Sequence, residues 1–202
     1  RIYNNAFIGF LTGISVAPAQ GGPTYIFRNV VADWHPSQSK AFQGYPFKFN
    51  FKSAFTTDWV YLYHNTCHTA RPGQPGFLFK SYSKWRGVVS RNNIYAGTGY
   101  ALESWPRSKF PVDFDYDDLY TADPKRLITW GGKKHGTLAD YSAATGQEKH
   151  GVSAPPGFVD ATKGDYRLAP GSAVIDKGVV IPGVNDDHAG AAPDLGAFEH
   201  SP

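Results

Sequence analysis

Leu62-Tyr63-His64-Asn65-Thr66-Cys67 is an apolar and aromatic segment interrupted by an amide, and four other segments of the chain repeat its arrangement. These segments occupy residues 2–7, 26–31, 89–94 and 114–119. The fourth position of each segment is an amide or a carboxylate, namely Asn5, Asn29, Asn65, Asn92 and Asp117. These positions are 24, 36, 27 and 25 residues apart. A recurring period of this size predicts stacked supersecondary units.

The residues around each polar position predict strands and not helices. The flanks are β-branched or aromatic and roughly alternate, as in strands packed on one face. The chain contains 22 Gly and 15 Pro, which interrupt every apolar pattern of helical spacing. One strand at a fixed place in every unit predicts a solenoid that adds one strand per coil to parallel sheets.

An amide at the same place in every coil has a physical use in such a stack. The turns superimpose from coil to coil, so the amides can hydrogen-bond along a column. Asn also tolerates the left-handed backbone conformation that the turn needs, and it can satisfy turn amides that would otherwise be buried unpaired. The alternative is that Asn is simply common in turns.

The C-terminal region carries a second set of motifs. They are Pro156-Gly157-Phe158-Val159-Asp160, residues 164–178 and Pro193-Asp194-Leu195-Gly196-Ala197-Phe198-Glu199. With these motifs and its amide column, the chain resembles the C-terminal half of a right-handed parallel β-helix protein of the pectate-lyase-like superfamily. The resemblance implies an all-β solenoid with coils over residues 1–125. The last coil or coils and an irregular C-terminal capping tail then occupy residues 126–202.

The same resemblance carries expectations about location and partners. It implies a bacterial carbohydrate-active protein that is secreted, periplasmic or on the cell surface, although lyases, hydrolases, epimerases and proteins of unknown activity share these motifs. Arg1 opens directly on a repeat, whereas the terminal repeats of solenoids normally carry a cap. We therefore expect the first coil to dock on N-terminal β-helix coils, from upstream residues, a second chain or a neighbour.

Composition limits the remaining classes of protein. A content of 41% hydrophobic and 15% aromatic residues suffices for one sizeable core. Cys67 is the single cysteine, and its place inside an apolar strand predicts a buried hydrophobic residue and not a nucleophile. No apolar run approaches the roughly 18 residues of a membrane span, so we expect no membrane partner.

Charge divides the chain into a basic and an acidic part. Residues 1–110 contain 12 Lys and Arg against 3 Asp and Glu, and residues 111–202 contain 8 against 14. A basic groove along the coils would favour a polysaccharide or oligosaccharide with acidic groups. The alternative is a set of solvated side chains on several faces. The candidate substrate-binding residues are Arg28, Lys48, Lys52, Lys80, Lys84, Trp85 and Arg86.

Alternation places two of these lysines on one surface. Phe47, Phe49 and Phe51 alternate with Lys48 and Lys52, so inward phenylalanines would direct both lysines outward. Lys84-Trp85-Arg86 repeats the idea in the next coil. An exposed Trp face and neighbouring cations would form a platform for acidic sugars.

Elimination on a uronate requires a cation, a base and an acid, and the basic coils contain such residues. The candidate catalytic residues are His64, Arg91, Asp33 and His35. Asp33 could orient His35, two residues later. In the repeat frame, Arg28, His64 and Arg91 would form an outward basic column, although a solvated stripe is equally compatible with the pattern.

Glycoside hydrolysis requires two carboxyl groups instead. Asp113, Asp115 and Asp117 would share one face of a strand, where they could also hold Ca²⁺; alternatively, Asp117 only continues the amide column. The run Asn185-Asp186-Asp187-His188 is more typical of turn chemistry than of a metal site. No cofactor is firmly indicated, and no phosphate-binding or dinucleotide motif is present.

The sequence therefore favours a secreted polysaccharide lyase acting on acidic glycans, without a nucleic-acid partner. Two alternatives stay open. One is a glycoside hydrolase with paired carboxylates. The other is a noncatalytic β-helix, such as an adhesin or a glycan-binding subunit.

Overall fold

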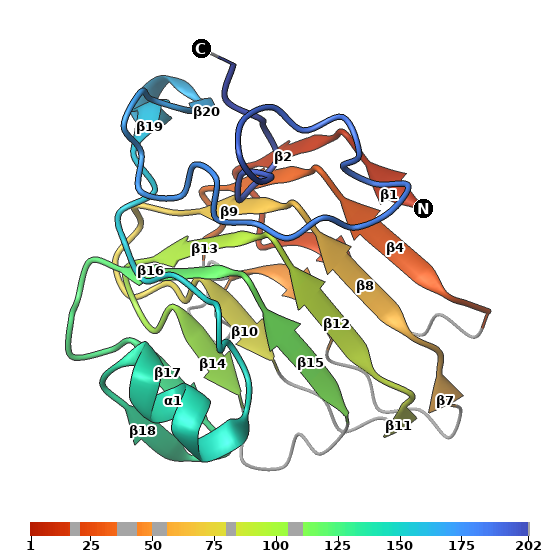
Figure 1. The fold of residues 1–202 in the computed structure, drawn as a ribbon. Helices are drawn as coiled ribbons and strands as arrows, with labels where there is room; N and C mark the ends of the chain where they lie inside the picture. The colour runs from red at the N-terminus through yellow and green to blue at the C-terminus, as the bar shows by residue number, and fades with distance from the viewer. Residues whose placement is uncertain (17–20, 36–43, 50–55, 80–83, 105–110, 202) are drawn as a thin grey trace.

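A computed structural model describes residues 1–16, 21–35, 44–49, 56–79, 84–104 and 111–201. These residues form a parallel β-solenoid whose strands stack coil upon coil, with one short α-helix near the C-terminal end of the stack (Figure 1). The prediction of an all-β parallel β-helix with an irregular C-terminal cap is confirmed.

Two five-stranded parallel sheets form the most regular walls of the solenoid. The first sheet contains β1 (Ile2–Tyr3), β4 (Thr24–Phe27), β8 (Val60–Tyr63), β12 (Val88–Arg91) and β15 (Val112–Asp115). The second contains β2 (Ala6–Ile8), β5 (Val30–Ala32), β9 (Thr66–His68), β13 (Ile94–Gly97) and β16 (Asp118–Thr121). Each coil adds one strand to each sheet, so equivalent residues lie in register.

Shorter groups of strands complete the coils. β3 (Thr12–Ser15) pairs with β6 (Tyr45–Lys48), and β7 (Thr56–Thr57) pairs with β11 (Lys84–Trp85). β10 (Phe77–Phe79), β14 (Leu102–Ser104) and β17 (Ile128–Trp130) are parallel, and β18 (Lys133–His135) turns back antiparallel to β17. The parallel coils therefore end at β17, and β18 begins the C-terminal region that does not follow the repeat.

A column of amides joins the turns between the first and second sheets. The backbone N–H and the side-chain Nδ2 of Asn5 both donate to Oδ1 of Asn29, at 3.2 and 3.1 Å. The same pair of bonds links Asn29 to Asn65, Asn65 to Asn93, and Asn93 to Asp117. We call this column the ladder. It satisfies turn amides inside the protein, as the repeat predicted.

The assignment of Asn92 to the ladder is wrong by one residue. Strand register aligns Ser90 with Leu62, so Asn93 and not Asn92 follows Asn65. The left-handed conformation also falls one place earlier than expected, on the residue before each ladder position. These residues are Asn4, Arg28, His64, Asn92 and Tyr116, with φ between 51° and 61°.

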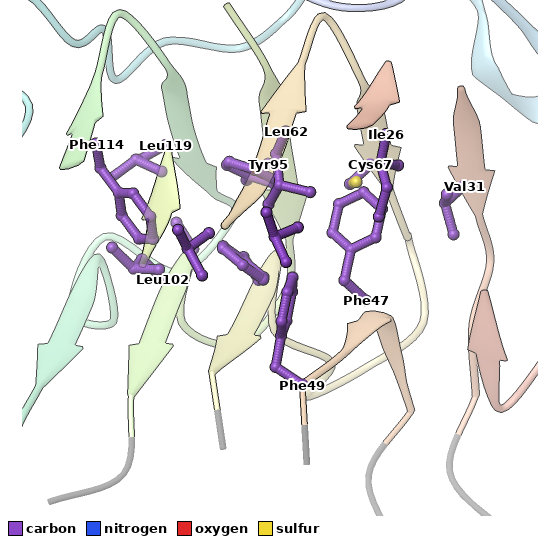
Figure 2. Close-up of a cluster of buried hydrophobic side chains, with 14 of the residues drawn as sticks. Ile26, Val31, Phe47, Phe49, Leu62, Cys67, Tyr95, Leu102, Phe114 and Leu119 are labelled. Carbon is purple, nitrogen blue, oxygen red and sulfur yellow. The ribbon is translucent and has the colours of Figure 1, made fainter. Parts of the chain in front are cut away.

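The core fills the space inside the coils with aromatic and aliphatic side chains (Figure 2). Phe77 stacks on Tyr95 with ring centroids 4.8 Å apart, and Phe47 meets Phe77 edge to face at 5.9 Å. Cys67 is fully buried among them, and burial raises the pKa of its thiol well above the ordinary value. The prediction that Cys67 is a buried hydrophobic residue is confirmed.

The last coil is covered by α1 (Leu138–Thr145), which begins after the capping residue Thr137 and ends at Gly146. Tyr141 of α1 is buried and packs edge to face on Trp130, with centroids 5.9 Å apart. None of the described helices is long and apolar enough to cross a membrane.

After α1 the chain runs back along the second sheet toward the first coil (Figure 1). β19 (Phe158–Asp160), the 3₁₀ turn Ala161–Lys163 and β20 (Asp165–Leu168) form an antiparallel hairpin. Residues 178–199, which we call the tail, then cross the ladder turns. The amide of Gly196 donates to the carbonyl of Asn92 at 2.8 Å, and the amide of Ala197 donates to Oγ1 of Thr66 at 2.8 Å.

Candidate functional site

The outward surface of the first sheet carries the side chains that do not pack in the core. Alternate residues of its strands point inward and are buried, namely Ile26, Val60, Leu62, Val88, Ser90 and Phe114. The outward residues form two rows across the strands. One row contains Tyr3, Phe27, Tyr63, Arg91 and Asp115, and the other contains Tyr25, Tyr61, Val89 and Asp113. We call this surface the aromatic face.

The rings of the aromatic face stack along the solenoid axis. Tyr3 and Phe27 have centroids 4.9 Å apart and planes inclined by 4°. Tyr25 and Tyr61 are also 4.9 Å apart, inclined by 13°. The spacing of parallel strands, about 4.8 Å, brings equivalent rings into this contact. Stacked rings cover one another's faces, so their edges and hydroxyl groups are the parts left to meet other groups.

Residues of the tail line one side of the aromatic face. A pocket of about 230 Å³ lies between the rings and the tail. It is lined by Arg1, Tyr25, Phe27, Tyr63, Pro182, Gly183 and Val184. Burial, and then the neighbouring Tyr61, raise the pKa of Tyr63 to about 12, so its phenol is protonated at neutral pH and can donate a hydrogen bond.

The other end of the aromatic face is charged. Nη2 of Arg91 lies 2.7 Å from Oδ1 of Asp113, and Nη1 of Arg91 donates to the carbonyl of Asp113. Asp115 accepts from the backbone N–H of His150 at 2.7 Å and contacts Nδ1 of His150 at 2.8 Å. Partial burial raises the pKa of Asp115, but these hydrogen bonds outweigh it and lower the pKa below its ordinary value. Asp115 is therefore a fixed carboxylate at neutral pH.

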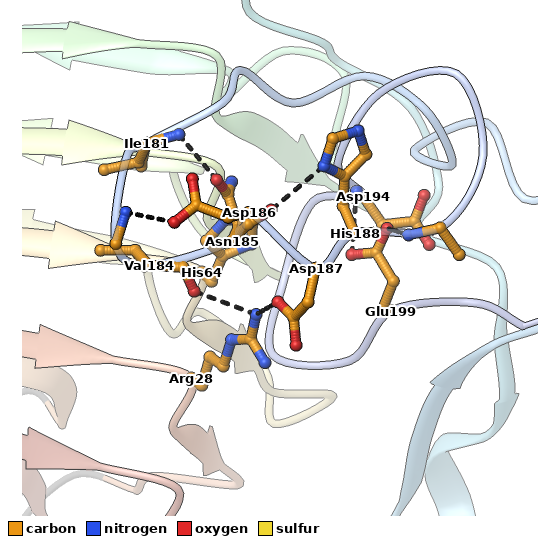
Figure 3. A network of polar contacts seen from close by, with 12 residues as sticks. Arg28, His64, Ile181, Val184, Asn185, Asp186, Asp187, His188, Asp194 and Glu199 are labelled. Carbon is orange, nitrogen blue, oxygen red and sulfur yellow. Dashed lines mark hydrogen bonds and ion pairs between the residues drawn. The ribbon is translucent and has the colours of Figure 1, made fainter.

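His64 is buried and does not face solvent as predicted. Its side chain lies beside Asn185 of the tail (Figure 3). Nδ2 of Asn92 and Nδ2 of Asn185 both approach its Nε2, at 2.9 and 2.7 Å. Burial, and then the charge of Arg28, lower its pKa to about 4. Because both neighbours are amide donors, Nε2 is the acceptor of a neutral imidazole. His64 holds the tail in place, and the prediction that its side chain points outward is wrong.

The predicted basic column is likewise wrong. Arg28 shares its frame position with His64, but Arg91 aligns with Tyr63 and belongs to the aromatic face. Arg28 also serves the tail, since its Nη2 donates to the carbonyl of Val184 at 3.1 Å and lies 3.4 Å from Oδ1 of Asp187 (Figure 3). The predicted alignment of Arg91 with Arg28 is wrong because it treats Asn92 as the ladder residue. The tail buries His64 and contacts Arg28, which the repeat pattern alone predicted to be exposed.

Asp33 and His35 lie beyond β5, after the second sheet, and are not brought together with Arg91. The carbonyl of Asp33 accepts from Nε of Arg71 at 3.0 Å, and Nε2 of His35 lies 3.1 Å from the carbonyl oxygen of Gly9. Both residues hold neighbouring coils together.

The predicted sugar platform around Trp85 is wrong in its central residue. Trp85 is 5% exposed and packs edge to face on Phe49, with centroids 5.3 Å apart. Arg86 is exposed and lies 3.7 Å from Asp58. Lys48 ends β6 and Lys84 begins β11, but their side chains lie outside the described residues. Lys52 and Lys80 also lie outside them.

The acidic cluster divides between two environments. Asp113 and Asp115 do share the aromatic face, but Asp117 is buried in the ladder, so the prediction of three carboxylates on one face is wrong. In residues 185–188, Oδ1 of Asn185 accepts from the N–H of Ile181, and Oδ2 of Asp186 accepts from the N–H of Gly183. Among the described residues, no group of three or more His, Cys, Asp or Glu side chains is placed to hold a metal ion.

A signal for the aromatic face was present in the repeat. Tyr3, Phe27 and Tyr63 occupy the second position of three of the five segments, and Tyr25 and Tyr61 precede them by two residues. Alternation of residues on either side of each ladder position would have identified both rows from the sequence.

Comparisons with protein-family models, with curated proteins and with solved structures found no match to this chain.

Proposed function

We propose that this protein is a secreted carbohydrate-active β-helix of the pectate-lyase-like kind and that it binds a glycan chain on the aromatic face. The observation that carries the proposal is the pair of stacked aromatic rows in register along the coils, bordered by a pocket against the tail. A glycan is itself a linear repeat, so a linear array of rings and hydroxyl groups complements it.

The chemistry of the aromatic face suits sugars. Tyr side chains present apolar ring edges beside hydroxyl groups, which match the C–H surfaces and hydroxyl groups of a pyranose. Pockets for drug-sized ligands occupy about 300–1,000 Å³, so the pocket of about 230 Å³ beside Tyr25 and Tyr63 fits a unit of one sugar ring. The protonated phenol of Tyr63 is placed to donate to it.

The charges of this face favour a neutral glycan. Arg91 is bound to Asp113, and Asp115 adds a second carboxylate on the same strand. An acidic sugar would have to compete with Asp113 for the guanidinium and approach a like charge at Asp115. The acidic glycan expected from the charge of the first 110 residues stays the alternative, since Arg1 lines the pocket beside Tyr25.

Hydrolysis is a second candidate function, supported by the placement of Asp113 and Asp115. The two residues lie two positions apart on one face of β15, so their Cα atoms are about 7 Å apart. Glycoside hydrolysis requires a pair of carboxyl groups, and these two side chains project from the same face. Asp115, with its lowered pKa, suits the role of base. Elimination through His64 loses its support, because His64 is buried and bound on Nε2.

The test is incubation of the purified protein with neutral and acidic polysaccharides and oligosaccharides. Binding is followed by titration calorimetry, while reducing ends and the ultraviolet absorbance of unsaturated products are recorded in parallel. The proposal predicts saturable binding of a neutral glycan. New reducing ends without a rise in absorbance would show that the protein also hydrolyses the glycan. Loss of these reducing ends in Asp115→Asn would assign the hydrolysis to Asp115. Absence of binding to every glycan by the folded protein would contradict the proposal.

A further inference from the structure

A tryptophan continues the aromatic face along β8. Val60 and Leu62 point inward and are fully buried. The alternate residues Trp59, Tyr61 and Tyr63 therefore point outward, and all three are partly buried. The ring centroids of Trp59 and Tyr61 lie 6.3 Å apart, with planes inclined by 22°. Those of Tyr61 and Tyr63 lie 5.8 Å apart, inclined by 42°. Three neighbouring rings thus form a line along one strand, in addition to the rows across the coils.

The glycine beside Trp59 on the next coil determines where the indole lies. Val60 pairs with Val88, so Trp59 lies beside Gly87. A Cβ atom at Gly87 would overlap Cζ3 of Trp59 and would lie 2.6 Å from its Cη2. The six-membered ring of the indole therefore occupies the space that a side chain at position 87 would fill. One side of the ring rests on the backbone that leads into β12, and the other side is turned away from it.

Polar contacts fix the backbone at the base of this indole. The N–H of Trp59 donates to Oδ1 of Asp58 at 2.8 Å, and Nε of Arg86 lies 3.7 Å from the same oxygen. The pair of Asp58 and Arg86 adds no net charge beside the ring. An indole offers a large apolar face and one N–H donor, which match the C–H surface and the hydroxyl groups of a neutral sugar.

The pocket against the tail lies at the opposite end of this line of rings. Tyr63 and Tyr25 line the pocket, and Tyr61 stacks on Tyr25, whereas Trp59 is not one of the lining residues. Four residues of extended strand separate Trp59 from Tyr63, which is about 13 Å. A single sugar in the pocket therefore does not reach the indole, but a chain of sugars that follows β8 does.

We propose that Trp59 forms a separate sugar subsite at the end of the aromatic face away from the tail. This inference rests on the proposed function and adds chain-length specificity to it. The terminal ring of a neutral glycan occupies the pocket beside Tyr63, the chain passes Tyr61, and a later ring stacks on the side of Trp59 turned away from Gly87. The protein then binds oligosaccharides more tightly than the corresponding single sugar.

The experiment measures affinity against chain length. Neutral oligosaccharides of increasing length, and their monosaccharide, are titrated by calorimetry into the original protein and into Trp59→Ala. In the original protein, affinity should rise once the chain is long enough to extend from the pocket to Trp59. In Trp59→Ala, the monosaccharide should bind as before, and the affinity for the long oligosaccharides should fall by about fivefold or more.

Two further variants separate stacking from a general effect on the fold. Trp59→Phe keeps an aromatic ring and should retain part of the gain with chain length. Gly87→Ala keeps the tryptophan but displaces its indole, and it should lose that gain as Trp59→Ala does. Circular dichroism checks that each variant is folded.

Two results would overturn the subsite while leaving the proposed function in place. One is full affinity of folded Trp59→Ala for the long oligosaccharides. The other is an equal loss of affinity for the monosaccharide and for the long chains, which would mean that Trp59 only supports the face. Absence of binding by the original protein would instead contradict the proposed function, and the subsite with it.

Discussion

Glu148 accepts the backbone N–H of Asp117 through its Oε2 at 3.2 Å, and both carboxyl groups are buried. Oδ2 of Asp117 and Oε1 of Glu148 have no hydrogen-bond partner among the described residues. The hydroxyl of Tyr141 in α1 is also buried, and burial and then the nearby Glu148 raise its pKa. The two carboxyl groups thus lie together in a place where two negative charges would be costly.

Stability should therefore fall as the pH rises above the acidic range. Burial raises the pKa of Asp117 from 3.8 to about 6, and burial and then Asp117 raise that of Glu148 well above 4.5. A pKa that is higher in the folded state gives stability that is complete below the unfolded-state pKa and is lost as pH rises through the folded-state value. Urea unfolding should show this decline as the pH rises from about 4 through the Asp117 value of about 6.

Glu148→Gln is the matched variant, since the amide can still accept from Asp117 but cannot ionise. The decline in unfolding free energy above pH 6 should become shallower in this variant. A variant profile as steep as that of the original protein would contradict the assignment to this pair.

His64 predicts the opposite dependence at lower pH. Its pKa falls from 6.5 to about 4 on folding, by burial and then by Arg28, so its contribution is complete above pH 6.5 and is lost as the pH falls toward 4. Protonation would destroy the acceptor that Asn92 and Asn185 share, and the tail should loosen. Limited proteolysis within residues 178–188 should accelerate between pH 6.5 and pH 4.

His64→Asn is the test of that mechanism, because Asn already occupies the same left-handed position at Asn4 and Asn92. This variant should show fast proteolysis of the tail at every pH. If its cleavage kept the pH dependence of the original protein, another group would control the tail.

The ladder should contribute to stability in proportion to its burial. Asn65 is fully buried, accepts from Asn29 and donates to Asn93 and to the carbonyl of Ile26. Each buried group left unpaired costs about 1–3 kcal/mol, so we expect Asn65→Ala to lower the unfolding free energy by about 3 kcal/mol. Asn5→Ala, at the exposed end, should cost less than about 1 kcal/mol. Equal losses in urea unfolding would contradict a cooperative buried column.

The solenoid was predictable because each coil repeats a short segment of alternating residues around one amide, and such a segment can be recognised without knowledge of distant contacts. The error of register arose because two asparagines, Asn92 and Asn93, are adjacent. The choice of Asn93 requires Ser90 to point into the core in place of a hydrophobic residue, which the sequence pattern does not suggest. The site was less predictable. His64 is buried by Asn185, 121 residues later in the chain, and no local pattern announces a contact of that range.

The direct test of glycan binding on the aromatic face is titration calorimetry of the best neutral glycan against Tyr61→Ala and Tyr63→Ala, with Val159→Ala as control. Val159 is an exposed apolar residue of β19, outside the face. Removing one tyrosine whose ring edge and hydroxyl group contact the glycan costs about 1 kcal/mol, so affinity should fall by about fivefold or more in each tyrosine variant and stay unchanged in Val159→Ala. Full affinity in both tyrosine variants, with the fold intact, would contradict the account.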